Sequence, residues 1–268
     1  MCKNSPFICL LVFCVALGLS ACQKVVQLDL RTAPPVYVIE GNITDQPGPY
    51  TVRILQTTGF YAADTFPGVA GAVVSIRDGA GYSEVLTDEG GGIYQTVNLQ
   101  GVQGQTYALR VLIGKDSFSA TSTMPYRVNL DSVYITPVRN SGKTVLVAVP
   151  AFTNPVGPGI AYYYFDQTIN GYLDKSFYYW NSKFSEGLAN TFNLERSSPD
   201  STLHTGDNVR VEMQCLDLAM YNYWESMDQS ASGSGGSYPG NPVTNLSGGA
   251  LGYFSAHTSQ VKSVIVGF

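Results

Sequence analysis

A pair of strand-forming runs stands near the start of the chain: Val36-Tyr37-Val38-Ile39-Glu40 and Tyr50-Thr51-Val52-Arg53-Ile54-Leu55, with Thr44-Asp45-Gln46-Pro47-Gly48-Pro49 between them. Apolar and β-branched residues favour strands, whereas proline and glycine favour turns. The same alternation of short apolar runs and glycine-rich turns continues to residue 124. We therefore expect about seven strands over residues 36–124.

The composition agrees with a protein of strands and turns. Of 268 residues, only 13% are charged, while 28 are glycine, 14 proline and 18 tyrosine. The 44% share of hydrophobic residues is enough to build a core, which excludes wholesale disorder. The formal net charge of −5 argues against a nucleic-acid partner.

A second series of strands is expected after Met124-Pro125-Tyr126. The segment 209–215 alternates, placing Val209, Val211, Met213 and Cys215 on one face of a strand, where Cys215 would be a buried, unreactive thiol. Residues 216–227 show helical spacing of apolar side chains, with Asp217 as the capping residue.

The expected fold is mostly β, with two β-sandwich domains. The first, residues 36–124, would be immunoglobulin-like or similar to transthyretin and the carboxypeptidase-regulatory domain. The second, residues 125–268, would be aromatic-rich, with one short helix, a flexible Gly/Ser loop at 230–237 and a closing strand at 261–266.

The N-terminus predicts export and lipidation. Residues 1–21 form a short apolar signal, too short for a membrane span, and end in Leu19-Ser20-Ala21-Cys22. This sequence resembles the bacterial lipobox, so we expect a lipid on Cys22 to hold the protein to a membrane through the linker 22–35. Lys24 is not the aspartate of inner-membrane retention, which favours the outer membrane and leaves the leaflet open. The alternative is an ordinary signal cleaved after Ala21.

We find no sequence signature of catalysis or of a cofactor. His204, His257 and Cys215 cannot supply the usual nitrogen and sulfur ligands of zinc, and the common catalytic motifs are absent. Two alternatives stay open: a Ser-His-Asp site assembled across strands, and calcium held by turn carboxylates. Those carboxylates, which turn geometry also explains, are Asp78, Asp88, Glu89 and Asp207.

Three aromatic clusters lie in the second half, at residues 162–165, 177–180 and 221–224. Successive strand residues face opposite sides, so rings must point both ways in the first two clusters. The candidates for contact with a partner or ligand are Tyr163, Tyr178, Trp180 and Trp224. The alternatives are rings buried on both faces of a sheet, and rings that stack on sugars.

Two short patterns match bacterial O-glycosylation. They are Asp131-Ser132-Val133 and Asp200-Ser201-Thr202. Glycosylation at Ser132 and Ser201 is therefore a hypothesis from sequence.

Several segments together resemble a known family. With the lipobox, Val38–Asp45, Pro47–Val52, Ala72–Ile76 and Asn245–Phe254 are similar to the DUF4249 family of Bacteroidota lipoproteins. Members tend to be encoded beside TonB-dependent outer-membrane transporters. The resemblance implies a non-enzymatic outer-membrane lipoprotein that serves as an accessory or binding subunit of such a nutrient-uptake system.

Two other functions remain open from sequence. One is a fimbrial or adhesin-type structural subunit, for which Arg31 lies at a suitable processing position in the linker. The other is a carbohydrate-binding module, which the aromatic clusters would serve.

Overall fold

The computed structural model describes residues 34–58, 66–140, 142–157, 159–197, 202–232 and 240–267. The predicted signal 1–21, the lipid-attachment residue Cys22 and nearly all of the linker 22–35 lie outside the described residues. So do Ser201 and most of the loop 230–237.

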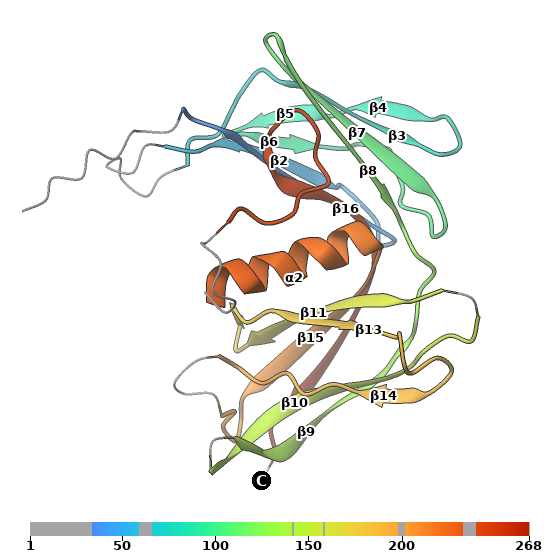
Figure 1. Ribbon diagram of the computed structural model, residues 1–268, viewed down its shortest axis with the longest axis vertical. Helices are drawn as coiled ribbons and strands as arrows, with labels where there is room; N and C mark the ends of the chain where they lie inside the picture. The colour runs from blue at the N-terminus through green and yellow to red at the C-terminus, as the bar shows by residue number, and fades with distance from the viewer. Residues whose placement is uncertain are drawn as a thin grey trace, which may run out of the picture. The chain divides into compact units, whose positions relative to one another are not determined.

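The described residues form sixteen strands and one helix (Figure 1). Their bounds are β1 Tyr37–Thr44, β2 Thr51–Gln56, β3 Val73–Asp78, β4 Ser83–Val85, β5 Thr87–Gly90, β6 Ile93–Gln95, β7 Thr106–Ile113, β8 Asp116–Thr123, β9 Leu130–Asn140, β10 Lys143–Thr153, β11 Tyr162–Ile169, β12 Tyr172–Leu173, β13 Tyr178–Asn181, β14 Ala189–Thr191, β15 Asn208–Leu216, α2 Leu218–Ser232 and β16 Leu251–Ile265.

The strands make three sheets in the described part of the chain. A nine-stranded sheet has the order β12-β11-β15-β16-β1-β2-β6-β5, with β13 also paired to β11. A four-stranded sheet has the order β4-β3-β7-β8, and a three-stranded sheet the order β14-β10-β9. The predicted mostly β composition with one helix is thus confirmed.

The first core lies between the nine-stranded and four-stranded sheets. Ile39, Val52 and Tyr94 come from the large sheet, and Ile76 and Leu109 from the small one. The alternating burial along these strands matches the alternation of apolar residues in the sequence. The eight strands β1–β8 account for the region where about seven were expected.

The second core lies between the other end of the nine-stranded sheet and the three-stranded sheet. Val209, Val211, Met213 and Cys215 of β15 are all buried there, as the sequence alternation predicts. Phe152 of β10 packs against them from the opposite layer. Cys215 is a free, buried thiol.

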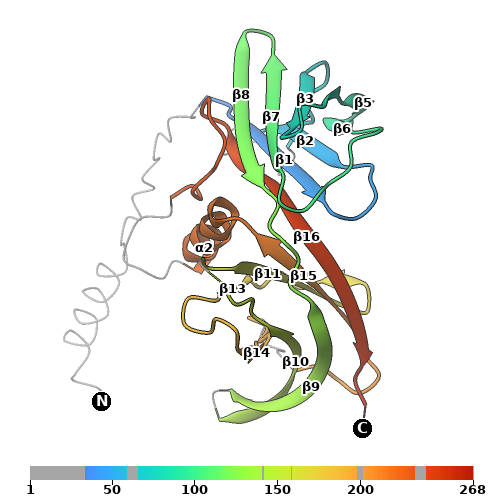
Figure 2. The ribbon, with the colours of Figure 1, turned by 90° about the vertical axis from the view of Figure 1, so that its right-hand side faces the viewer.

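Strand β16 joins the two cores (Figure 2). Its first half pairs in parallel with β1, and its second half pairs antiparallel with β15. Phe254 and Ala256 enter the first core, and Val264 packs against the second. Gly252 has φ +95°, and a Cβ there would lie 2.2 Å from the carbonyl oxygen of Ile39, so glycine is required where β16 approaches β1.

The last strand therefore differs from the sequence expectation. It begins at Leu251, ten residues before the predicted start at 261. Residues 34–268 form one compact unit, and part of the first core comes from the end of the chain. The boundary expected after residue 124 marks where the chain leaves the first core, but that core also needs residues 246–256.

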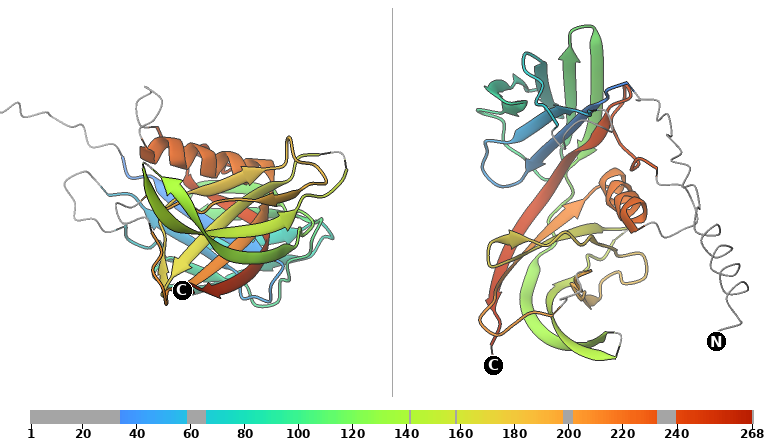
Figure 3. Two further views of the ribbon diagram at one scale, coloured as in Figure 1. Left: turned by 90° about the horizontal axis from the view of Figure 1, so that it is seen from below. Right: turned by 90° about the vertical axis from the view of Figure 1, so that its left-hand side faces the viewer.

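Helix α2 covers the face of the nine-stranded sheet opposite the second core (Figure 3). Asp217 Oδ1 accepts a hydrogen bond from the backbone N–H of Met220 at 2.9 Å, which confirms the predicted cap. Met220, Tyr223, Trp224 and Met227 all pack toward the sheet, as their spacing predicts. Within the part of the chain that the structure describes, no helix has both the length and the hydrophobicity needed to cross a membrane.

Candidate functional site

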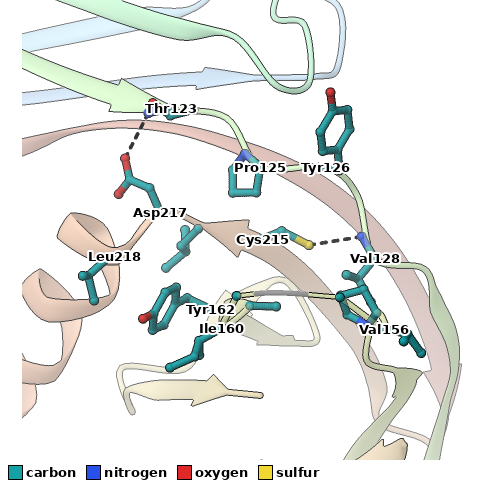
Figure 4. Close-up of a pocket in the computed structure, with 15 residues that line it drawn as sticks. Thr123, Pro125, Tyr126, Val128, Val156, Ile160, Tyr162, Cys215, Asp217 and Leu218 are labelled. Carbon is teal, nitrogen blue, oxygen red and sulfur yellow. Dashed lines mark hydrogen bonds between the residues drawn. The ribbon is translucent and has the colours of Figure 1, made fainter. Parts of the chain in front are cut away.

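An open apolar cleft lies where the chain passes from the first core to the second (Figure 4). Its volume is about 440 Å³, within the usual range of binding pockets. Its walls come from the linker between β8 and β9, the loop before β11, and the end of β15 with the start of α2. The lining residues are Thr123, Pro125, Tyr126, Val128, Pro155, Val156, Gly157, Gly159, Ile160, Ala161, Tyr162, Cys215, Leu216, Asp217 and Leu218.

Asp217 fastens one wall of the apolar cleft. Besides capping α2, its carboxylate accepts hydrogen bonds from Ser122 Oγ at 2.6 Å and from the backbone N–H of Thr123 at 3.0 Å. Ser122 in turn accepts the N–H of Ala256 in β16. The helix start, the end of β8 and the shared strand are therefore held together at this point.

The linker itself is fixed by two further groups. Arg127 binds the carboxylate of Asp45 through Nε at 3.0 Å, and Ser259 donates its backbone N–H to the same carboxylate at 3.0 Å. Burial raises the pKa of Asp45, but the bonds from Ser259 and Arg127 outweigh it, so the pKa lies below its usual value. The side-chain amide of Gln260 bonds the backbone of both Val128 and Leu130.

The opposite wall of the cleft is also ordered by hydrogen bonds. Ala161 and Ser182 exchange two bonds, at 2.8 and 2.9 Å, and the N–H of Gly157 donates to Glu186 at 2.7 Å. The buried amide of Asn154 donates to Ser185 and accepts the hydroxyl of Tyr163. The cleft is therefore formed in advance of any ligand, with little backbone left to order on binding.

The rim of the apolar cleft exposes large apolar side chains. Val156 is 83% exposed, Tyr126 76%, Leu218 51% and Ile160 41%. Neither lysine nor arginine is among the lining residues, and Asp217 is engaged internally. An apolar group that covered such a hollow and its rim would gain free energy, because the contact would remove apolar surface from water.

Cys215 lines the cleft without offering a reactive group. Its side chain is buried, and burial raises the pKa of the thiol, which stays protonated at neutral pH. Its sulfur accepts the backbone N–H of Val128 at 3.4 Å. The unreactive role expected from sequence agrees with this environment.

Two predicted contact residues are not at the surface. Tyr163 is fully buried and Tyr178 nearly so, both in the second core. Tyr178 donates its hydroxyl to Asp174 at 2.7 Å. Neither ring is exposed to a partner or ligand, which corrects the expectation for these two, because β10 covers the face of β11 and β13 from which they project.

The other two predicted contact residues are half-buried. Trp224 stacks on Tyr164 at 4.4 Å between ring centroids and so serves the packing of α2 on the sheet. Trp180 packs against Phe192 and also lines a second hollow of about 530 Å³. We call this hollow the aromatic pocket; it is lined by Tyr179, Trp180, Asn181, Lys183, Phe184, Ser185 and Tyr221.

Both faces of the aromatic clusters are thus covered along most of their length. The second core covers one face and α2 the other. The interpretation of rings as packing on both sides describes most of them, and the surface features lie at their edges, in the apolar cleft and the aromatic pocket.

Three of the four turn carboxylates accept backbone hydrogen bonds within their turns or from a neighbouring segment. Asp78 accepts the N–H of Tyr82, Asp88 those of Gly71 and Gly90, and Asp207 that of His204. Among the described residues, no three histidine, cysteine, aspartate or glutamate side chains group closely enough to hold a metal ion. Ser132 is an exposed residue of β9, accessible to modification.

His257 is the nearest approach to a catalytic pair. Its Nδ1 is 2.8 Å from Ser255 Oγ, and both residues are buried in β16. Burial lowers the pKa of His257 to about 4, so the ring is neutral at physiological pH. Neither residue lines the apolar cleft or the aromatic pocket, and the pair has no route to a substrate through them.

Sequence reasoning missed the residues that form the cleft. Tyr126, Val156, Ile160 and Leu218 lie in separate segments and show no common motif. One signal was present: Leu218 is an apolar residue at the start of the predicted helix.

The fold and this site define a mostly β protein with an apolar cleft. The family model described as "Domain of unknown function (DUF4249)" matches residues 23–263, and the chain belongs to this family. None of the curated proteins matches it. The resemblance inferred from residues 38–52, 72–76 and 245–254 is confirmed at the level of the family.

Proposed function

We propose that this protein is a non-enzymatic outer-membrane lipoprotein that binds a TonB-dependent nutrient transporter through its apolar cleft. Lipid on Cys22 would hold it to the membrane. Its two halves, each a sheet packed on the shared nine-stranded sheet, would act as a sandwich-like scaffold. The lipobox-like sequence at 19–22 supports the anchor, and membership of the DUF4249 family supports the association with uptake.

The exposed apolar rim of the cleft is the main support for a protein partner. Water-exposed clusters of large apolar side chains around a hollow are unfavourable unless something covers them. Val156 and Tyr126 are each more than three-quarters exposed and belong to two different segments that line the cleft. This arrangement is typical of the anchor sites at which protein partners insert an aromatic or aliphatic side chain.

A protein fits the cleft better than a lipid surface does. The cleft is concave, and a bilayer is contacted by protruding apolar groups flanked by lysine and arginine. The lining residues include no such cation. A protruding apolar side chain of the transporter, on a segment without strong charge, is therefore the occupant we assign to the cleft.

The first experiment isolates the tagged protein from its native membranes with mild detergent. We expect a TonB-dependent transporter to co-purify with the wild type and to fall at least about tenfold with the double variant Tyr126→Ser, Val156→Ser, equivalent to about 1.4 kcal/mol. Both side chains are largely exposed, so the fold should be kept. Val97→Ser, at an exposed valine of the first half, is the matched control. If no transporter is recovered with the wild type, or if equal amounts are recovered with the wild type and the double variant, the cleft is not the transporter-binding site.

The second experiment tests the anchor separately. Labelled palmitate should enter the wild type and not the Cys22→Ser variant, which should leave the membrane fraction. Equal labelling of both proteins would contradict the proposed membrane anchor. The partner experiment would still be interpretable, because binding at the cleft can be measured with protein prepared without detergent.

A further inference from the structure

The aromatic pocket differs from the apolar cleft in having polar groups among its rings. Tyr179, Tyr221 and Phe184 supply ring surface, while Asn181 and Lys183 supply an amide and an ammonium group. The pocket is separated from the cleft by Tyr162, whose ring packs on Tyr221 at 5.0 Å between centroids. It is therefore a separate place on the surface with a different chemistry.

The polar groups are held in place by the chain itself. Asn181 Nδ2 donates to the hydroxyl of Tyr221 at 3.0 Å, and Asn181 Oδ1 accepts the backbone N–H of Lys183 at 3.2 Å. Tyr221 thus accepts one bond and keeps its own proton to donate. Burial raises the pKa of Tyr221, so this proton is present at neutral pH. Ser185 is fixed by the buried amide of Asn154 at 2.7 Å.

A second observation comes from Trp180. Its indole N–H is buried and has no hydrogen-bond partner among the described residues. Buried donors without partners are rare, and each needs an explanation. Trp180 also lines the aromatic pocket, while its ring packs on Phe192 in the second core.

The combination of groups selects the ligand chemistry. Flat rings pack against the C–H face of a sugar, and amide and hydroxyl groups bond its hydroxyls. The lining residues include no aspartate or glutamate, and their one cationic side chain is Lys183. We propose that the aromatic pocket binds a pyranose sugar, either neutral or carrying a carboxylate. This site is independent of the proposed transporter contact.

The fit of volume supports a small saccharide. The pocket measures about 530 Å³, in the range of small-molecule sites. Phe184 is 89% exposed at its edge, which is costly for a phenyl ring in water and is relieved when a sugar face covers it. Lys183 Nζ lies 5.4 Å from the Phe184 ring centroid, so the cation and the ring form one edge of the pocket.

The test begins with the purified protein on an array of short neutral and uronic-acid oligosaccharides built of pyranose rings. Any sugar that binds is then titrated against the protein by tryptophan fluorescence, with Trp180 as the reporter within the pocket. We expect Phe184→Ala to weaken binding roughly tenfold and Tyr221→Phe several-fold. Phe184 is exposed, so its variant should fold normally.

Tyr172→Ala is the matched control, because Tyr172 is an 81% exposed aromatic residue outside the pocket. It should bind as the wild type does, and so should the cleft variant Val156→Ser. A silent array overturns the proposal, as does a bound sugar whose affinity is unchanged in both Phe184→Ala and Tyr221→Phe. Neither result affects co-purification of the transporter, so the two proposals fail separately.

Discussion

Tyrosines in the first core and at the edge of the second are used differently. Tyr50 and Tyr94 are buried, and their hydroxyls donate to backbone carbonyls of the same half at 2.6 and 2.8 Å. Tyr162, Tyr179 and Tyr221 instead pack on one another and line the apolar cleft or the aromatic pocket. The same residue type closes loops in the first half and lines surface hollows in the second, so tyrosine content alone does not locate a site.

The two halves share strand β16 and should therefore unfold together. The variant with the largest expected effect tests this. Phe254→Ala removes a fully buried ring from the first core and should lower the free energy of unfolding by about 3–5 kcal/mol. Both tryptophans, Trp180 and Trp224, lie in the second half. Because β16 serves both cores, tryptophan fluorescence during urea unfolding should report the full loss.

The control for this experiment is Val97→Ala, at an exposed position of the first half, which should leave the urea midpoint nearly unchanged. Phe254→Ala could instead lower the urea midpoint followed by circular dichroism and leave the midpoint followed by tryptophan fluorescence unchanged. The two halves would then unfold separately, as independent domains.

The second prediction contrasts buried carboxylates of the two halves. Burial raises the pKa of Asp166 to about 6, and Glu212 directly across the strand pair adds to the rise. Burial also raises the pKa of Glu84 in the first half, but backbone N–H groups of Val97, Asn98 and Leu99 outweigh it and lower that pKa overall. Hydrogen bonds thus stabilise the charged form of Glu84 in the first half, whereas burial destabilises the charged form of Asp166 in the second.

The two acids affect stability with opposite signs. Asp166 binds its proton more tightly when folded, so its own contribution to stability should rise as pH falls below about 6 and should be lost as pH rises through that value. Glu84 stabilises above its unfolded pKa of about 4.5, and this is lost only as pH falls through its lower folded value. His257 opposes Asp166: burial holds its pKa at about 4, so its contribution to stability falls as pH drops from about 6.5 to 4.

Asp166→Asn measures the first of these effects. It should raise the free energy of unfolding at pH 8 by about 2 kcal/mol, somewhat below the ~3 kcal/mol equivalent to the whole shift, and this gain over the wild type should shrink as pH falls from 7 to 5. Urea unfolding at several pH values gives both quantities. Asp131→Asn, at an exposed position, is the control. If Asp166→Asn leaves the pH dependence of the free energy of unfolding unchanged, Asp166 is not the titrating group.

The smallest effect compares the tyrosines directly. Tyr94→Phe removes a hydroxyl that donates to Val69 and accepts from Ala72, and should cost about 1 kcal/mol. Tyr221→Phe should cost less than about 0.5 kcal/mol, since its hydroxyl bonds only a partly exposed amide. Thermal unfolding of the pair measures this difference. Equal losses would mean that Tyr221 is as structural as Tyr94.

Local features of this fold could be predicted from the sequence. The alternation of residues 209–215 predicted the buried face of β15, and Asp217 predicted the start of α2. Both follow from neighbours within a few residues, where periodicity and capping chemistry act. The turn roles of Asp78 and Asp88 were predictable for the same reason.

The long-range features could not be predicted. The closing strand was expected only from residue 261, yet Ser255, His257, Thr258 and Ser259 are buried in β16. Their burial depends on partners far along the chain, such as Asp45 for Ser259, which periodicity does not encode. The apolar cleft likewise arises from pairing the linker at 125–129 with the loop at 155–161, and no local pattern joins these segments.

Strand β16 has a consequence for synthesis. Its residues leave the ribosome after every other described strand, yet β1 waits for them as its parallel neighbour. Contacts of such sequence separation form slowly, so a nascent chain remains open until nearly all of it has been made. A truncation before residue 251 leaves both cores unclosed and the product open to proteases.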